Sequence, residues 1–169
     1  MPRTPRHAFW MLLGLWAWLA LVGPVGARWA FAENPRLARL EQQLHRDVNA
    51  FRTSQRLIAL ERRADLDAVA RAHSEDMIRR GFFAHEDPEG LLWHDRIDRA
   101  GITGYTMAGE NVAQTNEADP NESVLAGWEN SPDHRRNLEF RAYNATGVGI
   151  ARAPDGRLFY TQLYVTFPR

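Results

Sequence analysis

The sequence predicts an α+β domain in which helices pack over an antiparallel sheet. Two segments in the first half of the chain, residues 34–53 and 65–80, carry apolar residues at helical spacing. Near the end, residues 147–167 contain two apolar runs separated by a Pro-Asp-Gly turn, which is typical of a β-hairpin. Helices early in a chain and a hairpin late in it are typical of the α+β class.

The first helix is expected to begin at Pro35 and to end near Thr53. Asn34 is a good N-cap, and proline is favoured at the first helical position. The apolar stripe of this helix consists of Leu37, Leu40, Leu44, Val48 and Phe51. A second helix is expected from a cap at Asp65 to Gly81 as the residue after its end. Its inward face consists of Leu66, Val69, Ala70, His73 and Met77.

The middle of the chain predicts shorter elements. Residues 82–92 are expected to be irregular, because a proline and a glycine close a turn there. The polar stretch 115–121 is expected to form a surface loop. The remaining elements are a helix over 93–100, an extended segment over 110–113, a helix over 122–130 capped by Asn121, and a short helix that begins at Pro132 behind Ser131 as N-cap.

The C-terminal hairpin supplies the central part of the predicted sheet. Its first strand includes residues 147–150, and residues 154–156 form the turn. The second strand, residues 158–167, carries apolar side chains on both of its faces. We therefore expect this strand to be central and to be covered on both sides.

The N-terminus is typical of a secretory signal peptide. A basic start at Arg3 and Arg6 precedes an apolar run over 9–22, and Ala30-Phe31-Ala32 is a small-x-small cleavage site. We predict cleavage after residue 32, which places the mature protein outside the cytoplasm, secreted or periplasmic. The alternative is an uncleaved N-terminal membrane anchor, although the run is short for a span of about 20 apolar residues. Residues 33–169 are long enough for one hydrophobic core, so a single domain is expected.

Composition excludes several classes of chemistry. The chain has 21 basic and 21 acidic residues, and three of the arginines but none of the acids lie in residues 1–32, so the mature domain has a formal net charge of −3. This charge argues against a nucleic-acid partner. All the basic residues are arginine, which excludes lysine catalysis, and the absence of cysteine excludes thiol nucleophiles, thiolate metal sites and disulfides.

Several short motifs recur in an order that carries a family resemblance. They begin with Asn49-x-x-Arg52 and Asp95-Arg96, continue with Gly109-Glu110-Asn111 and Trp128-x-x-Ser-Pro-x-His-Arg, and end with the Gly-x-Gly of the hairpin. From about residue 48 to residue 167, the chain resembles the CAP superfamily (SCP domain) of cysteine-rich secretory proteins, antigen 5 proteins and plant pathogenesis-related proteins. The absence of cysteine favours its bacterial secreted branch. The resemblance implies an α-β-α sandwich with helices packed on an antiparallel sheet.

The resemblance also implies a cavity site that contains His85, Glu110 and His134. Two histidines and one glutamate resemble a catalytic zinc site with an open fourth position, so His85, His134 and possibly Glu110 are the expected metal ligands. Glu110 is alternatively a carboxylate that orients a histidine, or a purely structural one. His134 is expected in the first turn of a helix, where the local positive potential favours a neutral ring. Taken without the family, a histidine in a loop such as that of His85 is more often an exposed or hydrogen-bonded residue, and His134 is alternatively a solvent-facing residue of a short helix.

One expected member of the family site is missing. Many relatives carry a second glutamate three positions after the tryptophan, where this chain has Ser131. The nearest acid is Glu129, one position after the tryptophan. Successive residues of a helix differ by about 100° in direction, so Glu129 need not face the cavity and is only a weak candidate.

Three functions remain open from the sequence. The first is a secreted binding module, expected to be monomeric, whose cavity holds a divalent metal such as zinc and an unidentified extracellular or envelope ligand. The second is a metal-dependent hydrolase or peptidase with Glu110 as its base. The third is an envelope protein that binds a lipid or a sterol. No serine lies in a nucleophile-elbow context, so a serine hydrolase has no support.

Overall fold

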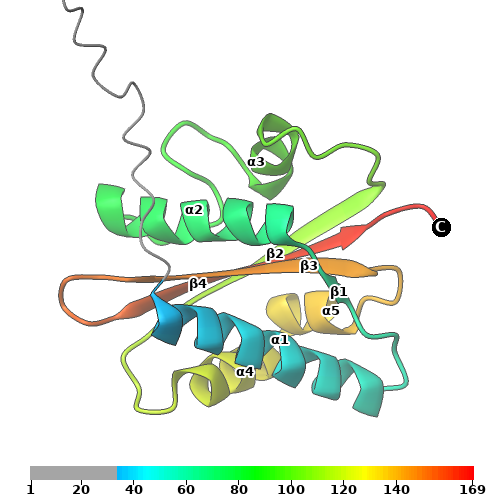
Figure 1. The fold of residues 1–169 in the computed structure, drawn as a ribbon, viewed down its shortest axis with the longest axis horizontal. Helices are drawn as coiled ribbons and strands as arrows, with labels where there is room; N and C mark the ends of the chain where they lie inside the picture. The colour runs from blue at the N-terminus through cyan, green and yellow to red at the C-terminus, as the bar shows by residue number, and fades with distance from the viewer. Residues whose placement is uncertain (1–33) are drawn as a thin grey trace, which may run out of the picture. The chain divides into compact units, whose positions relative to one another are not determined.

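Four strands form one sheet in the order β1–β3–β4–β2, and the C-terminal hairpin lies at its centre (Figure 1). The computed structural model describes residues 34–169, so the predicted signal peptide and its cleavage site lie outside the described residues. The strands are β1 (Glu61–Arg62), β2 (Met107–Thr115), β3 (Ala145–Arg152) and β4 (Leu158–Thr166). The hairpin pair β3–β4 is antiparallel, as predicted, and β2 also pairs with β4 in antiparallel register. Strand β1 adds a two-residue parallel pair to β3.

Helices cover both faces of the sheet, which confirms the α+β class and the three-layer arrangement. In Figure 1, α2 and α3 lie over one face, and α1, α4 and α5 lie over the other. The helices are α1 (Pro35–Ser54), α2 (Ala64–Arg80), α3 (Trp93–Arg99), α4 (Pro120–Asn130) and α5 (Pro132–Glu139). None of the helices within residues 34–169 combines the length and the apolar character that a membrane span requires.

Each face of the sheet has its own hydrophobic core. Tyr160 and Tyr164 of β4 face α1 and α4, where they pack with buried Leu44 and Trp128. Leu163 of β4 points to the opposite face and packs among the apolar residues of α2 and α3. The alternation along β4 therefore supplies both cores, as expected for a central strand.

Helix α2 lies directly against the backbone of β3, which explains the Gly-x-Gly of the hairpin. A Cβ atom on Gly147 would lie under 3.0 Å from backbone atoms of Leu66 and Asp67. A Cβ atom on Gly149 would lie equally close to backbone atoms of Ala70 and Arg71. Two glycines are therefore needed for this contact between layers.

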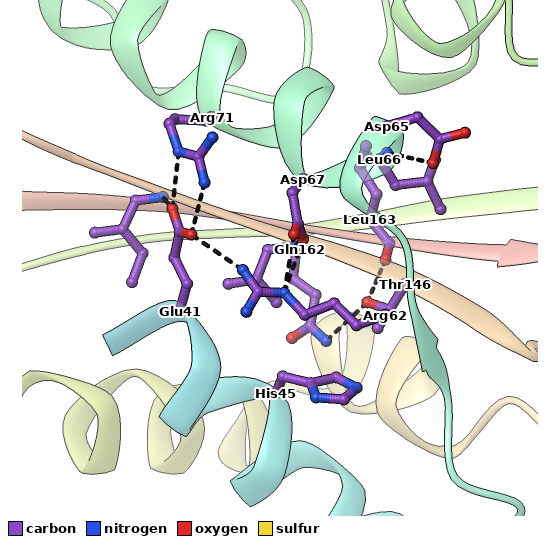
Figure 2. A network of polar contacts seen from close by, with 12 residues as sticks. Glu41, His45, Arg62, Asp65, Leu66, Asp67, Arg71, Thr146, Gln162 and Leu163 are labelled. Carbon is purple, nitrogen blue, oxygen red and sulfur yellow. Dashed lines mark hydrogen bonds and ion pairs between the residues drawn. The ribbon is translucent and has the colours of Figure 1, made fainter. Parts of the chain in front are cut away.

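A buried polar network joins α1, α2 and β3 (Figure 2). Glu41 is 1% exposed, accepts a hydrogen bond from the backbone N–H of Ile150, and forms ion pairs with Arg62 and Arg71 at 3.0 and 2.7 Å. Asp67 accepts from the N–H of Val148 at 2.8 Å and also pairs with Arg62. Both carboxylates thus bind backbone N–H groups of β3 beyond the two residues that β1 pairs.

Side-chain donors bind the outer side of β2 in the same way. The indole N–H of Trp93 donates to the Ala108 carbonyl, and that of Trp128 donates to the Val112 carbonyl, both at 3.1 Å. The Asn137 amide donates to the Glu110 carbonyl at 3.0 Å. These bonds fix α3, α4 and α5 against β2.

Some element bounds differ from the predictions. The extended segment 110–113 is part of the nine-residue strand β2, which pairs with β4 along its whole length. The N-cap of α4 is Asp119, not Asn121, because Pro120 occupies the first helical position and the Asp119 carboxylate accepts from the N–H of Glu122. Asn121 instead binds the Leu40 carbonyl and the Tyr160 hydroxyl.

Two other predicted caps make different contacts. The N-cap of α2 is Arg63, and Asp65 lies in the first turn, where its carboxylate accepts from the N–H of Leu66. Ser131 is the N-cap residue of α5, as predicted, but its side chain makes no capping hydrogen bond.

Candidate functional site

The three predicted site residues meet at edge strand β2, which is contacted by α3 of one helical layer and by α5 of the other. Glu110 and Asn111 are adjacent in β2, so their side chains point to opposite faces of the sheet. Glu110 binds residues of α3 and of the loop after α2, whereas Asn111 binds α5. The strand thereby links His85 on one side to His134 on the other.

Glu110 is a fully buried carboxylate with both oxygens engaged. The Nδ1 atom of His85 lies 2.8 Å from one oxygen, and the guanidinium of Arg96 lies 2.7 Å from the other. The Glu110 side chain is 0% exposed, and that of His85 is 39% exposed. Glu110 therefore orients the His85 ring, which was one of the roles expected from the sequence.

The bond to Glu110 also selects the tautomer of His85. A carboxylate can only accept, so Nδ1 carries the hydrogen in the neutral ring and Nε2 keeps its lone pair. Trp93 packs edge-on against this ring with centroids 5.8 Å apart. The free nitrogen of His85 is thus available to a ligand, a proton or a metal.

Arg96 organises the loop that carries His85, and sequence reasoning missed this role. Besides Glu110, its guanidinium binds the carbonyls of His85 and Leu91 at 3.0 and 2.8 Å. Asp95, the preceding residue, accepts from the N–H of Leu92 at the start of α3. The Asp95-Arg96 pair was noted as a motif, but only the fold shows which partners it holds.

His134 lies in the first turn of α5, as predicted, with its ring centroid 6.2 Å from that of His85. Burial and then the charge of His85 lower the pKa of His134, while Asp133 acts in the opposite direction. The predicted neutral ring is therefore favoured at neutral pH, and burial is the main cause.

A frame of amides holds β2 against α5. The Asn111 amide donates to the His134 carbonyl and to the Tyr164 hydroxyl, and its oxygen accepts from Asn137 at 2.9 Å. Gly109 is needed beside this frame, because a Cβ atom there would lie under 3.0 Å from the Tyr143 hydroxyl and the Asn137 oxygen. Asn137 was also missed from the sequence, although it lies only three positions after His134.

The other candidates lie apart from this cluster. Glu129 is half-buried, and among residues 34–169 its carboxylate has no hydrogen bond or ion pair to the cluster. His73 is a packed core residue that binds the Ala84 carbonyl, as expected from its place on the inward face of α2, and His94 is a surface residue. Trp128, Tyr160 and Tyr164 are core residues rather than groove residues.

The arrangement limits how a metal would be held. Within the described residues, no group of three or more His, Asp or Glu side chains is arranged to bind a metal ion. The His85 and His134 rings remain a fitting pair of nitrogen donors, whereas Glu110 would have to leave His85 or Arg96 to become a ligand. The geometry therefore fits two histidine ligands with Glu110 behind one of them, and not a three-ligand set.

A separate groove of about 420 Å³ lies between the C-terminal end of α2 and the hairpin turn. Its apolar walls include Met77, Phe82 and Phe159, and Phe83 at its rim is 44% exposed. None of the three site residues lines it.

Comparisons with known proteins bear on the family and the fold of the chain. A sequence model of the CAP, or cysteine-rich secretory protein, family matches residues 45–164. The chain is 32% identical over 125 residues to the uncharacterized membrane protein YlbC of Bacillus subtilis, which covers 74% of this chain and 34% of YlbC. It is 33% identical over 118 residues to the uncharacterized protein YkwD of the same organism, covering 70% of this chain and 44% of YkwD. The chain thus spans less than half the length of either relative.

Solved structures show the same fold. An extracellular protein containing an SCP domain from Bacillus anthracis is 32% identical, with a TM-score of 0.67 over 76% of this chain and 41% of that one. An outer surface protein of Borrelia burgdorferi is 19% identical, with a TM-score of 0.70 over 77% of this chain and 94% of that one. At that identity, the second likeness bears on the fold alone.

Proposed function

The chain belongs to the CAP family of cysteine-rich secretory proteins, in its bacterial form, and from that premise we propose that it is an exported binding domain that uses His85 and His134 to bind its ligand together with a divalent metal ion. The single observation that carries the proposal is the buried Glu110, which holds His85 by Nδ1 and leaves Nε2 free beside the His134 ring. A fold alone does not define an activity, whereas these side chains have a defined chemistry.

The buried ion pair explains why the His85 ring is held in place. Arg96 compensates the charge of Glu110, so the carboxylate can stay buried while it accepts from His85. Histidine ligands of metals usually donate their second ring nitrogen to such a carboxylate. Because only two donors converge, water or the ligand itself would complete the coordination, and a bound ion would act as a Lewis acid on a ligand oxygen.

Export is the second part of the proposal. The predicted signal peptide supports it, and so does the similarity to a protein described as extracellular. The mass of the exported protein tests the cleavage site, because cleavage after residue 32 leaves Glu33 as the N-terminus. An intact full-length mass in the membrane fraction would instead support the anchor alternative.

Zinc titration calorimetry tests the site. The purified domain should bind about one Zn²⁺ near pH 7.5, and binding should weaken as the pH is lowered, because a protonated imidazole has no lone pair for a metal. His85→Ala and His134→Ala should each largely abolish binding. Glu110→Gln keeps the shape but removes the charge behind His85, so it should weaken binding by about 10–100-fold.

The matched control is His94→Ala. His94 is an exposed histidine whose ring faces Asp95 at 3.6 Å, so its loss should leave zinc affinity unchanged. Equal affinity in the wild type and both site variants would refute the metal site and leave a metal-free binding domain.

Lipid binding is a second candidate, favoured by the aromatic side chains in the first groove, among which Phe83 is exposed. A fluorescent fatty acid should bind the wild-type domain and should bind Phe83→Ser more weakly. Binding that is equal in the two proteins would remove this candidate. No observation favours the hydrolase hypothesis, because both oxygens of its expected base, Glu110, are engaged.

A further inference from the structure

A second groove, of about 470 Å³, is lined by arginines and apolar residues. It lies where the loop after α1, the loop before β3 and the end of β4 come together. Its lining includes Arg56, Arg141 and Arg169 but no aspartate or glutamate side chain. The groove shares no residue with the His85 site, and its volume is within the usual range for small-ligand pockets.

The three arginines of this groove have no acidic partner. Within residues 34–169, the side chains of Arg56, Arg141 and Arg169 form neither an ion pair nor a hydrogen bond. Elsewhere in the domain, arginines are commonly paired, as Arg62 and Arg71 are with Glu41. Three guanidinium groups outweigh the single α-carboxylate that Arg169 carries, so they create a positive potential around the groove in a domain whose formal net charge is negative.

Buried Arg52 adds a fourth positive charge that no carboxylate compensates. It is 0% exposed, and its guanidinium donates to four backbone carbonyls. These acceptors are Ile58 on one side and Leu138, Phe140 and Tyr143 on the other. Ile58 belongs to the wall that carries Arg56, and Phe140 and Tyr143 flank Arg141. Arg52 therefore fixes both walls and adds its own poorly screened charge to their field.

The third wall, formed by the end of β4 and the residues after it, is fixed as well. The Asn144 amide donates to the Phe167 carbonyl at 2.7 Å, and the Phe167 N–H donates to the Asn144 oxygen at 3.0 Å. Thr166 also binds the Ala142 carbonyl. A groove with fixed walls loses little conformational entropy when a ligand binds.

Backbone geometry and apolar surface add to the pattern. Arg56 has a φ of 60°, a conformation that favours glycine or asparagine, yet an arginine occupies it. Ile58, in the same wall, is 43% exposed. The groove thus offers guanidinium groups beside an apolar surface.

We propose that this groove is a binding site for a phosphate-bearing ligand. Guanidinium groups bind phosphate oxygens through paired, charge-assisted hydrogen bonds, and several of them together match the multiple charge of phosphate. The exposed apolar side chain suits a ligand whose phosphate is joined to a larger body. This site is independent of the histidine site, so either proposal can fail alone.

The test uses pyrophosphate as the probe and the domain of residues 33–169 as the protein. Pyrophosphate should bind saturably in calorimetry, and its affinity should fall as sodium chloride is raised. The double variant Arg56→Gln, Arg141→Gln should weaken binding by at least about tenfold, since it removes two of the charge-assisted donors to phosphate. Both side chains are exposed, so the variant should fold, and its circular dichroism and melting temperature verify this.

Arg39→Gln is the matched control. Arg39 is also an exposed arginine, but it lies in α1, 17 positions before Arg56. At the rise of a helix, this separation corresponds to roughly 25 Å. This variant should bind pyrophosphate as the wild type does.

Vesicles separate two sources of the phosphate. Binding to phosphatidylglycerol vesicles that pyrophosphate competes away would identify a lipid headgroup, whereas pyrophosphate binding without vesicle binding would identify a soluble ligand. Either result supports the site. Undetectable pyrophosphate binding, or equal binding by the wild type and the folded double variant, would overturn it.

Discussion

Replacing Arg52 with methionine should destabilise the domain strongly, although no carboxylate contacts this arginine. The methionine retains much of the apolar stem but cannot reach the four carbonyls that the guanidinium binds. The bonds to Leu138 and Tyr143 are buried, whereas the other two are partly buried, so water can replace the latter more easily.

The magnitude follows from the two buried acceptors. A buried acceptor without a partner costs about 1–3 kcal/mol, so the two together cost about 2–6 kcal/mol. Burial lowers the pKa of Arg52, which shows that its charge is itself costly to bury, and removing the charge offsets part of the loss. A net loss of about 1–4 kcal/mol remains, and this corresponds to a fall in Tm of roughly 3–20 °C for a domain of this size.

Thermal unfolding followed by circular dichroism measures the effect. Arg39→Met on the same helix is the control, because Arg39 is exposed, and a surface change of this kind alters stability by less than about 0.5 kcal/mol. If Arg52→Met unfolded within about 3 °C of the wild type, the four carbonyl bonds would not be needed to hold the loops.

Three further changes test other parts of the fold. Asn111→Ala removes the amide that binds the His134 carbonyl and accepts from Asn137, so it should lower the free energy of unfolding in urea by at least about 1–3 kcal/mol; an unchanged midpoint would contradict the frame. Gly149→Ala should lower the free energy of unfolding by about 1–3 kcal/mol or more, because the new Cβ would meet the backbone of α2. Gly127→Ala in α4 should be neutral or stabilising, because nothing lies within 4 Å of the new Cβ. Similar urea midpoints for the two variants would refute the contact at Gly149. Burial is the main cause that lowers the pKa of His73. As the pH falls below about 6.5, the unfolded chain therefore binds more protons than the folded one. The free energy of unfolding should be full above that pH and should decline below it. Unfolding in urea at pH 7.5 and 5.5 should show a smaller decline in His73→Gln than in the wild type, and an equal decline would argue against His73 as the source.

The sequence was sufficient for elements whose signals are local. Apolar spacing with Asn34 and Pro35 at the start predicted α1, and the alternating face of residues 158–167 predicted a central strand. The short strand β1 could not be predicted, because two residues carry no periodicity and their pairing with β3 depends on a distant segment. Asp119 and Asn121 are both good cap residues, and the tertiary bonds of Asn121 to α1 and β4 decide between them.

The candidate site was predictable to the level of its residues but not of their roles. Motif resemblance placed His85, Glu110 and His134 in one site, and the fold brings them together at β2. Arg96 occupies the second oxygen of Glu110. This role could not be predicted, because Arg96 lies in another element and no sequence pattern shows that it is close to Glu110. Asn137 was missed for the same reason.

The side-chain bonds along β3 and β2, at the two open edges of the sheet, have a consequence for association between molecules. An open sheet edge can take up a strand from another chain, which leads to aggregation or strand exchange. Here the outward N–H groups of Val148 and Ile150 are bound by Asp67 and Glu41. At the opposite edge, side-chain donors hold the carbonyls of Ala108, Glu110 and Val112. An incoming strand would have to break these bonds first, so a protein partner of this domain should be recognised through side-chain contacts and not by extension of the sheet.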